Sequence, residues 1–115
     1  MHITEERRSA KLAIVHLEGQ METKTAQSVE ERFTRLLDDG VHQLAIDCGG
    51  LNYINSMGLR VFLKTTKAIK AVGGSVVLFA LPGSVRTIFE IAGFCSIFDI
   101  VATCDDALER LCAEE

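Results

Sequence analysis

The sequence predicts an α/β fold, a small open mixed β-sheet, mostly parallel, of about four to five strands with helices packed on it. Short apolar runs typical of buried strands recur along the chain. Between them lie longer segments in which apolar residues repeat every three or four positions, as on one face of a helix. At 115 residues and 48% hydrophobic content, the chain can bury a core of its own. We therefore expect residues 1–115 to form a single domain.

The first part of the chain predicts two strands and a helix. Residues 3–8 carry a weak edge-strand signal, and residues 11–18 form a clearer run of β-compatible residues. A helix follows, for which Thr23 or Thr25 can provide the N-cap. It ends at residues 38–40, where the glycine suits a left-handed C-terminal position. The predicted inward face consists of Ala26, Val29, Phe33, Leu36 and Leu37.

The middle of the chain predicts a central strand, a tight turn and a long helix. Residues 44–46 show no polar alternation, which favours a strand covered on both faces. Residues 49–50 are a glycine pair that allows a tight turn. The next helix starts at Ser56, whose hydroxyl can cap the first turn, and ends at the glycine pair 73–74. The predicted inward face consists of Leu59, Phe62, Leu63, Thr66 and Ile69.

The last third predicts two more strand and helix pairs. Residues 76–81 form an apolar strand, and residues 82–83 form a turn. Ser84 is expected to cap a short helix. Residues 97–101 predict a final strand before a helix that opens at Asp105. The expected order is therefore β-β-α-β-α-β-α-β-α.

Ser56 is the candidate functional residue. Sites in open parallel sheets gather at the carboxyl ends of the strands. The hydroxyl of Ser56 lies at the positive end of a helix dipole, where a phosphate is favoured, although a serine there can also be a helix cap alone. Met57 beside it is a candidate partner contact. Glu22 is either a solvated loop charge or a ligand for a partner's cation. Three segments follow predicted strands and are expected on one edge: 19–22, 47–56 and 82–84.

Composition excludes several classes of function. The formal net charge is −4 without a basic block, so we expect no nucleic-acid partner. No apolar run reaches membrane-spanning length and the N-terminus is polar, which predicts no membrane insertion and a cytoplasmic protein. No nucleotide-binding glycine fingerprint or nucleophile elbow occurs, so we expect neither an enzyme nor a cofactor. The cysteines show no C-x-x-C spacing, so we expect reduced thiols that fill space in the apolar core and no metal site. They are Cys48, Cys95, Cys104 and Cys112.

The segment Leu51-Asn52-Tyr53-Ile54-Asn55-Ser56-Met57-Gly58-Leu59, after Leu44-Ala45-Ile46-Asp47, resembles the signature Leu-Asp…Ile-Asp-Ser-x-Gly-Leu of STAS domains. The likeness is strongest to the bacterial anti-sigma factor antagonists. Residues 20–26 similarly resemble the family's Gly-x-Leu-Asp-x-x-Thr-Ala loop, and residues 15–19 its opening strand. Two positions depart from the pattern, since Asn55 and Glu22 both stand where the family commonly has Asp.

The resemblance implies a phosphorylation switch. In this family the serine matching Ser56 is phosphorylated by a partner that is both an anti-sigma factor and an ATP-dependent serine kinase. The unphosphorylated protein binds that partner and frees a sigma factor. A serine phosphatase removes the phosphate. The alternative is a constitutive STAS subunit of a stress-sensing scaffold or lipid-transport complex, with Ser56 only a helix cap. The partner-binding residues implied are Glu22, Asn55, Ser56, Met57 and Gly58.

Overall fold

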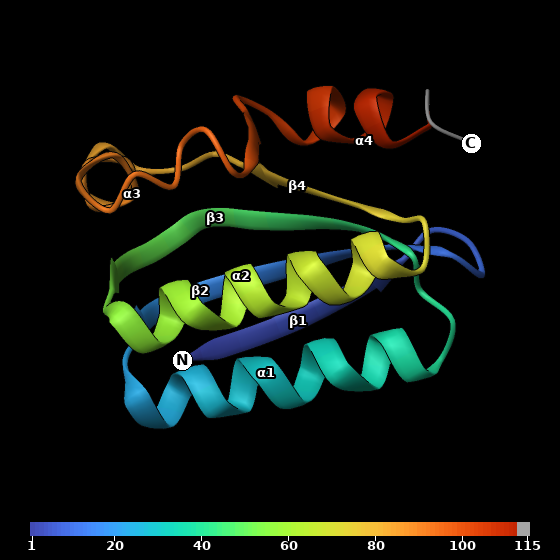
Figure 1. Ribbon diagram of the computed structural model, residues 1–115, viewed down its shortest axis with the longest axis horizontal. Coiled ribbons are helices and arrows are strands. Elements are labelled where there is room, and N and C mark those ends of the chain that lie inside the picture. Colours follow the sequence, from blue (N-terminus) through green and yellow to red (C-terminus); the bar gives the residue numbers. More distant parts are fainter. Residues whose placement is uncertain (113–115) are drawn as a thin grey trace.

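The computed structural model describes residues 1–112 and confirms the predicted α/β class and element order. Strands and helices alternate after an initial pair of strands (Figure 1). The elements are β1 (His2–Arg7), β2 (Leu12–Met21), α1 (Thr23–Asp38), β3 (Gln43–Ile54), α2 (Ser56–Ala71), β4 (Ser75–Phe79), α3 (Gly83–Ile91), β5 (Asp99–Val101) and α4 (Cys104–Cys112).

The strands form one open mixed sheet in the order β1-β2-β3-β4-β5. Only the first pair, β1 with β2, is antiparallel, and the other three neighbouring pairs are parallel. Helices α1 and α2 lie side by side on one face, while α4 lies on the opposite side of the sheet (Figure 1). The fold is therefore a sheet covered by helices on both faces, as expected for parallel strands.

Two apolar clusters hold the layers together. The larger one lies beneath α1, α2 and α3 and contains a group of phenylalanines: Phe33, Phe62, Phe89 and Phe98. The smaller one lies beneath α4, where Ala107 and Leu111 pack against strand residues such as Ile14 and Val77. The helix that begins at Ser56 is thus fixed to the sheet by the larger cluster.

β3 is much longer than the sequence indicated. The prediction of a turn at Gly49 and Gly50 was wrong, because both residues lie within the strand. Pairing with β2 continues through a register shift, so that His16 faces Asp47 but Glu18 faces Gly50. A Cβ at Gly50 would lie 2.7 Å from the Glu18 Cγ and 3.0 Å from the Leu17 carbonyl oxygen. Gly50 therefore allows β2 and β3 to approach each other closely, and it does not reverse the direction of the chain.

Two predicted helix caps were also wrong. The N-cap of α1 is Glu22, and the Thr25 hydroxyl instead accepts a hydrogen bond from the Glu22 backbone N–H at 2.7 Å. The N-cap of α3 is Pro82, without a side-chain cap hydrogen bond, so Ser84 lies inside the helix. In both cases the helix begins one to three residues earlier than the predicted caps suggested.

Candidate partner-binding site

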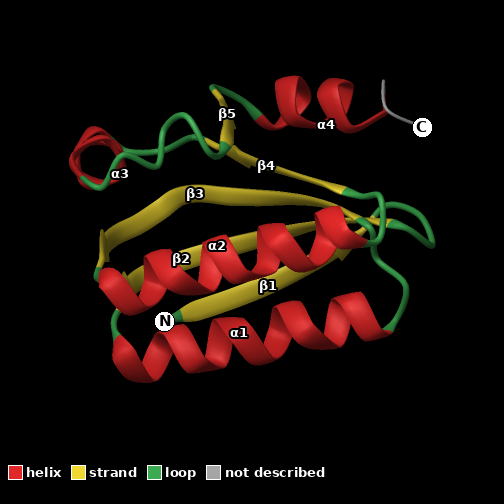
Figure 2. Cartoon of the chain, viewed as in Figure 1, coloured by secondary structure: helices red, strands yellow, loops and turns green. Residues whose placement is uncertain are grey.

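The ends of β2 and β3 bring Glu22 and Asn55 together. Met21 pairs with Ile54 in the parallel ladder, and the Asn55 N–H donates to the Met21 carbonyl oxygen at 3.0 Å. Glu22 and Asn55 follow these strands directly and both line a shallow cavity of about 360 Å³. This edge, where the strands give way to α1 and α2, is visible at the left of Figure 2. The ends of the predicted segments 19–22 and 47–56 therefore meet at one edge, whereas residues 19–21 and 47–54 lie within β2 and β3.

Asn55, and not Ser56, caps α2. The Asn55 backbone is extended, and its Oδ1 accepts hydrogen bonds from the Met57 N–H at 3.0 Å and the Gly58 N–H at 3.1 Å. Ser56 is the first helical residue, from which a hydroxyl does not reach the next two N–H groups. The assignment of the cap to Ser56 was therefore wrong by one residue.

The Ser56 side chain is accessible from solvent. It is exposed to solvent, and its hydroxyl has no hydrogen-bond partner within residues 1–112. Because Asn55 satisfies the first-turn amides, folding does not require the hydroxyl of Ser56. A group added to it would lie at an exposed position next in sequence to Asn55, which lines the cavity.

Met57 and Gly58 are less accessible than the sequence implied. Met57 is half-buried and packs against the larger apolar cluster, so only part of its side chain is accessible to a partner. Gly58 is buried, and a Cβ there would lie 2.6 Å from the Ile54 Cγ1 and 2.9 Å from the Met21 Cγ. Gly58 therefore lets α2 begin close against the strand ends. The direct partner contacts of both residues stay predictions.

Tyr53 was missed by the sequence interpretation. Its side chain is 44% exposed although its neighbours Leu51 and Ile54 are buried, and it lines the same cavity as Glu22 and Lys24. Alternation from the buried Leu51 would have turned Tyr53 inward, but a register shift skips Asn52 in the pairing with β2 and leaves Tyr53 exposed. A partly exposed tyrosine among charged residues is typical of protein interfaces. The chain near this edge thus presents a partly exposed aromatic ring and an exposed hydroxyl.

Asp47 supports the strand and takes no part in the edge. Its Oδ2 lies 2.7 Å from the His16 Nδ1, and its Oδ1 accepts a hydrogen bond from the Gly49 N–H at 2.9 Å.

Burial, with the neighbouring Asp47 charge, raises the pKa of the Cys48 thiol, which stays neutral. The prediction that the cysteines fill apolar space in the core holds for the buried Cys48 but not for the exposed Cys112. Within residues 1–112, no group of His, Cys, Asp and Glu is arranged to hold a metal ion.

Asn55→Ala is expected to lower the free energy of unfolding by about 1 kcal/mol, because two first-turn N–H groups lose their acceptor. Urea denaturation followed by circular dichroism measures this change. Asn55→Asp is the matched control, since it keeps an acceptor and adds a charge suited to the helix dipole. A loss as large in Asn55→Asp as in Asn55→Ala would contradict the capping role.

A family model for the STAS domain matches residues 3–107. The chain belongs to the STAS domain family.

Three relatives make the comparison specific. A candidate anti-sigma factor antagonist of Bordetella bronchiseptica, BtrV, is 38% identical over 89 residues, which cover 77% of each chain. The anti-sigma-B factor antagonist of Bacillus subtilis is 30% identical over 95 residues, covering 83% of this chain and 86% of the relative. The anti-sigma factor antagonist SpoIIAA in its unphosphorylated form has a TM-score of 0.85 at 18% identity, covering 97% of both chains. SpoIIAA has also been solved in a phosphorylated form, with a TM-score of 0.75 at 17% identity and coverage of 95% and 98%.

The comparisons confirm the family recognised from segment 51–59 and the fold. The curated relatives are regulatory binding proteins and not enzymes, in agreement with the expectation from the sequence. Across residues 1–112, no helix is long and apolar enough to cross a membrane.

Proposed function

We propose that this protein is an anti-sigma factor antagonist whose binding to an anti-sigma factor is switched off by phosphorylation of Ser56. The unphosphorylated protein would bind its partner through the edge formed by Glu22, Asn55, Ser56, Met57 and Gly58. The partner would also be the ATP-dependent serine kinase, and a serine phosphatase would restore the active form. We further propose that residues 1–115 act as one cytoplasmic domain without a cofactor of its own.

One observation carries this proposal: the exposed hydroxyl of Ser56 is not used by the fold. A serine that served only as a helix cap would hydrogen-bond the first turn, but Asn55 makes both of those bonds. That difference favours the switch over the alternative of a constitutive scaffold subunit. The relatives named anti-sigma factor antagonists, and the existence of phosphorylated SpoIIAA, support the same proposal.

A phosphate on Ser56 can block binding without refolding the domain. It adds roughly −1.5 to −2 charges at neutral pH and three acceptor oxygens. At the start of α2 it lies at the favourable end of the helix dipole, so the free protein tolerates it. On a partner-covered edge the same group must lose its water, and it repels any carboxylate that approaches. Phosphorylation is therefore expected to weaken the complex far more than the fold.

Ser56→Asp is expected to weaken partner binding at least about tenfold, which corresponds to about 1.4 kcal/mol. The reduction arises because one added charge reproduces part of the effect of the phosphate. The measurement is affinity capture from lysate of the native cell with ADP or ATP, using wild-type protein and Ser56→Asp as baits. We expect the wild type to retain an ATP-binding anti-sigma factor and to become phosphorylated at Ser56 when ATP is present.

Ser28→Asp is the matched control, since it adds the same charge at an exposed position of α1. It should retain the partner as the wild type does. Equal retention of the same partners by wild type and Ser56→Asp would contradict the switch. Recovery of other STAS subunits or a transporter ATPase with both baits would instead establish the scaffold alternative.

A further inference from the structure

The exposed face of α2 concentrates positive charge in a chain that is negative overall. The helix carries four basic side chains and no acidic one, whereas the whole chain has a formal net charge of −4. This is a third of the twelve lysines and arginines, within sixteen of 115 residues. All four are exposed, and we call them the basic face: Arg60, Lys64, Lys67 and Lys70.

The basic face begins one turn after Ser56. Spacings of three and four residues place Ser56, Arg60, Lys64 and Lys67 along one side of the helix, and Lys70 continues it. From Arg60 to Lys70 this face extends about 15 Å along the axis. The basic face is thus continuous with the edge at which we propose that the partner binds.

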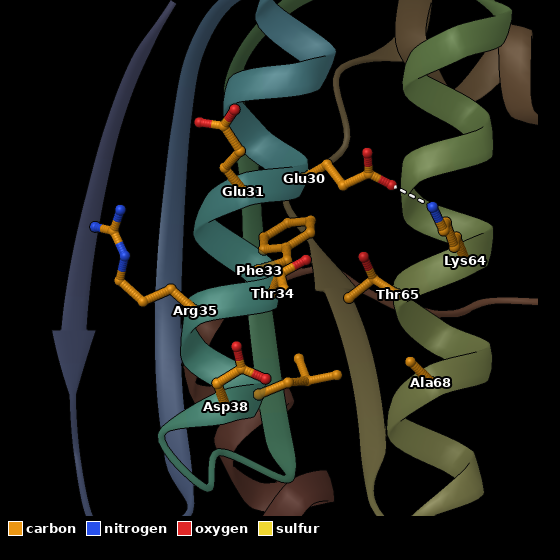
Figure 3. Close-up of a pocket in the computed structure, with 10 residues that line it drawn as sticks. Glu30, Glu31, Phe33, Thr34, Arg35, Asp38, Lys64, Thr65 and Ala68 are labelled. Atoms are coloured by element: carbon orange, nitrogen blue, oxygen red, sulfur yellow. Dashed lines mark hydrogen bonds and ion pairs between the residues drawn. The ribbon is translucent and has the colours of Figure 1, made fainter.

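Most of this charge is not neutralised within the protein. Lys64 reaches across to α1, where its Nζ lies 2.9 Å from the Glu30 Oε2 (Figure 3). Arg60, Lys67 and Lys70 form no ion pair with any residue in 1–112. An exposed pair such as Lys64 with Glu30 is weak and salt-sensitive, so a partner's carboxylate can replace Glu30.

The neighbouring helix limits where an acidic partner can lie. A groove of about 530 Å³ separates α1 from α2, and its α1 wall carries Glu30, Glu31 and Asp38 (Figure 3). Arg35, the basic residue on that wall, and Glu31 both point away from α2 (Figure 3). Because α1 carries three acidic and three basic side chains, its net charge is zero, and a negatively charged surface is attracted over α2 without a matching attraction over α1.

We propose that the basic face of α2 docks an acidic surface of the anti-sigma factor partner, extending the interface that begins at Ser56. This inference rests on the proposed function. A protein surface of mixed composition fits better than a nucleic acid or an anionic membrane, because those extended polyanions would also meet the acidic remainder of the chain. The main contribution of the basic face is to the rate of association, because exposed charges act mostly on encounter.

The same geometry couples docking to phosphorylation. A phosphate on Ser56 would place roughly −1.5 to −2 charges one turn from Arg60 and would offset much of the positive charge of the basic face. The modification would then slow encounter with an acidic partner in addition to blocking contact at the edge.

The first test uses the purified anti-sigma factor recovered by the wild-type bait. Association rates are measured by stopped flow for wild type and for the double variant Arg60→Glu and Lys67→Glu. At about 50 mM salt we expect the double variant to associate about tenfold more slowly, with the difference shrinking at about 500 mM. Lys11→Glu is the control, since Lys11 is exposed immediately before β2, outside the basic face, and the association rate should stay within about twofold of wild type. Equal rates for wild type and the double variant would overturn the proposal.

The second test needs no partner and separates this inference from the proposed function. Labelled wild-type protein is titrated with decaglutamate at low salt, and amide shifts are followed by NMR. We expect shifts confined to α2 that disappear in the double variant. If no anti-sigma factor is recovered, the proposed function fails, and this titration alone decides whether the basic face is a docking surface. Absence of α2 shifts, or tighter binding of a short DNA duplex or of phosphatidylglycerol vesicles at the same amides, would overturn the assignment.

Discussion

Phe62→Ala is expected to lower the free energy of unfolding by about 3–5 kcal/mol. Phe62 lies on α2, is 1% exposed, and its ring centroid lies 6.3 Å from Phe33, 6.1 Å from Phe89 and 6.5 Å from Phe98. Removing it leaves a cavity where α1, α2, α3 and the chain before β5 meet. Three tilted or edge-on ring contacts are lost together with the apolar burial. Urea unfolding followed by circular dichroism measures the loss.

Phe94→Ala is the matched control for this substitution. Phe94 is only half-buried, and its one ring contact is with Phe98 at 5.8 Å. Phe94→Ala should lower the free energy of unfolding by about 1–2 kcal/mol, because part of the Phe94 side chain is already in water. Similar losses for both variants would show that the core is not centred on Phe62. Phe62 is buried and cannot contact a partner directly. Partner affinity should therefore fall in Phe62→Ala only as far as the folded fraction falls.

Gly74→Ala is expected to be the other large effect, costing about 3 kcal/mol or more in the free energy of unfolding. A Cβ at Gly74 would overlap the His42 carbonyl oxygen, a backbone atom that cannot turn away like a side chain. That same oxygen accepts the Ser75 N–H hydrogen bond at 3.0 Å, where β4 begins beside β3. The two strands must therefore separate to admit a single methyl group. Thermal unfolding and urea unfolding both measure this change.

Gly73→Ala provides the control at the adjacent position. Gly73 has φ of +81°, but no heavy atom lies within 4 Å of a Cβ built there. Gly73→Ala should therefore lower the free energy of unfolding by about 1–2 kcal/mol, through the left-handed backbone conformation alone. If Gly73→Ala proved as damaging as Gly74→Ala, backbone conformation and not close approach would explain both glycines.

The sequence by itself determined the α/β class, the order of strands and helices, and the start of α2 at Ser56. These features are encoded locally, since amphipathic repeats and apolar runs report which face of each element is buried. It also determined the family, because segment 51–59 matches in sequence order without reference to folding. The importance of Gly73 and Gly74 as a helix stop was equally readable from residue type.

The tertiary structure alone decided how far β3 extends and which residue caps α2. β3 continues through Gly49 and Gly50 because β2 offers backbone partners across a register shift, and no local pattern reports what another strand offers. The freedom of the Ser56 hydroxyl follows from Asn55 reaching the first-turn amides, a matter of backbone geometry one residue earlier. Local periodicity records burial, whereas hydrogen-bond partners and close contacts depend on segments that are distant in the chain.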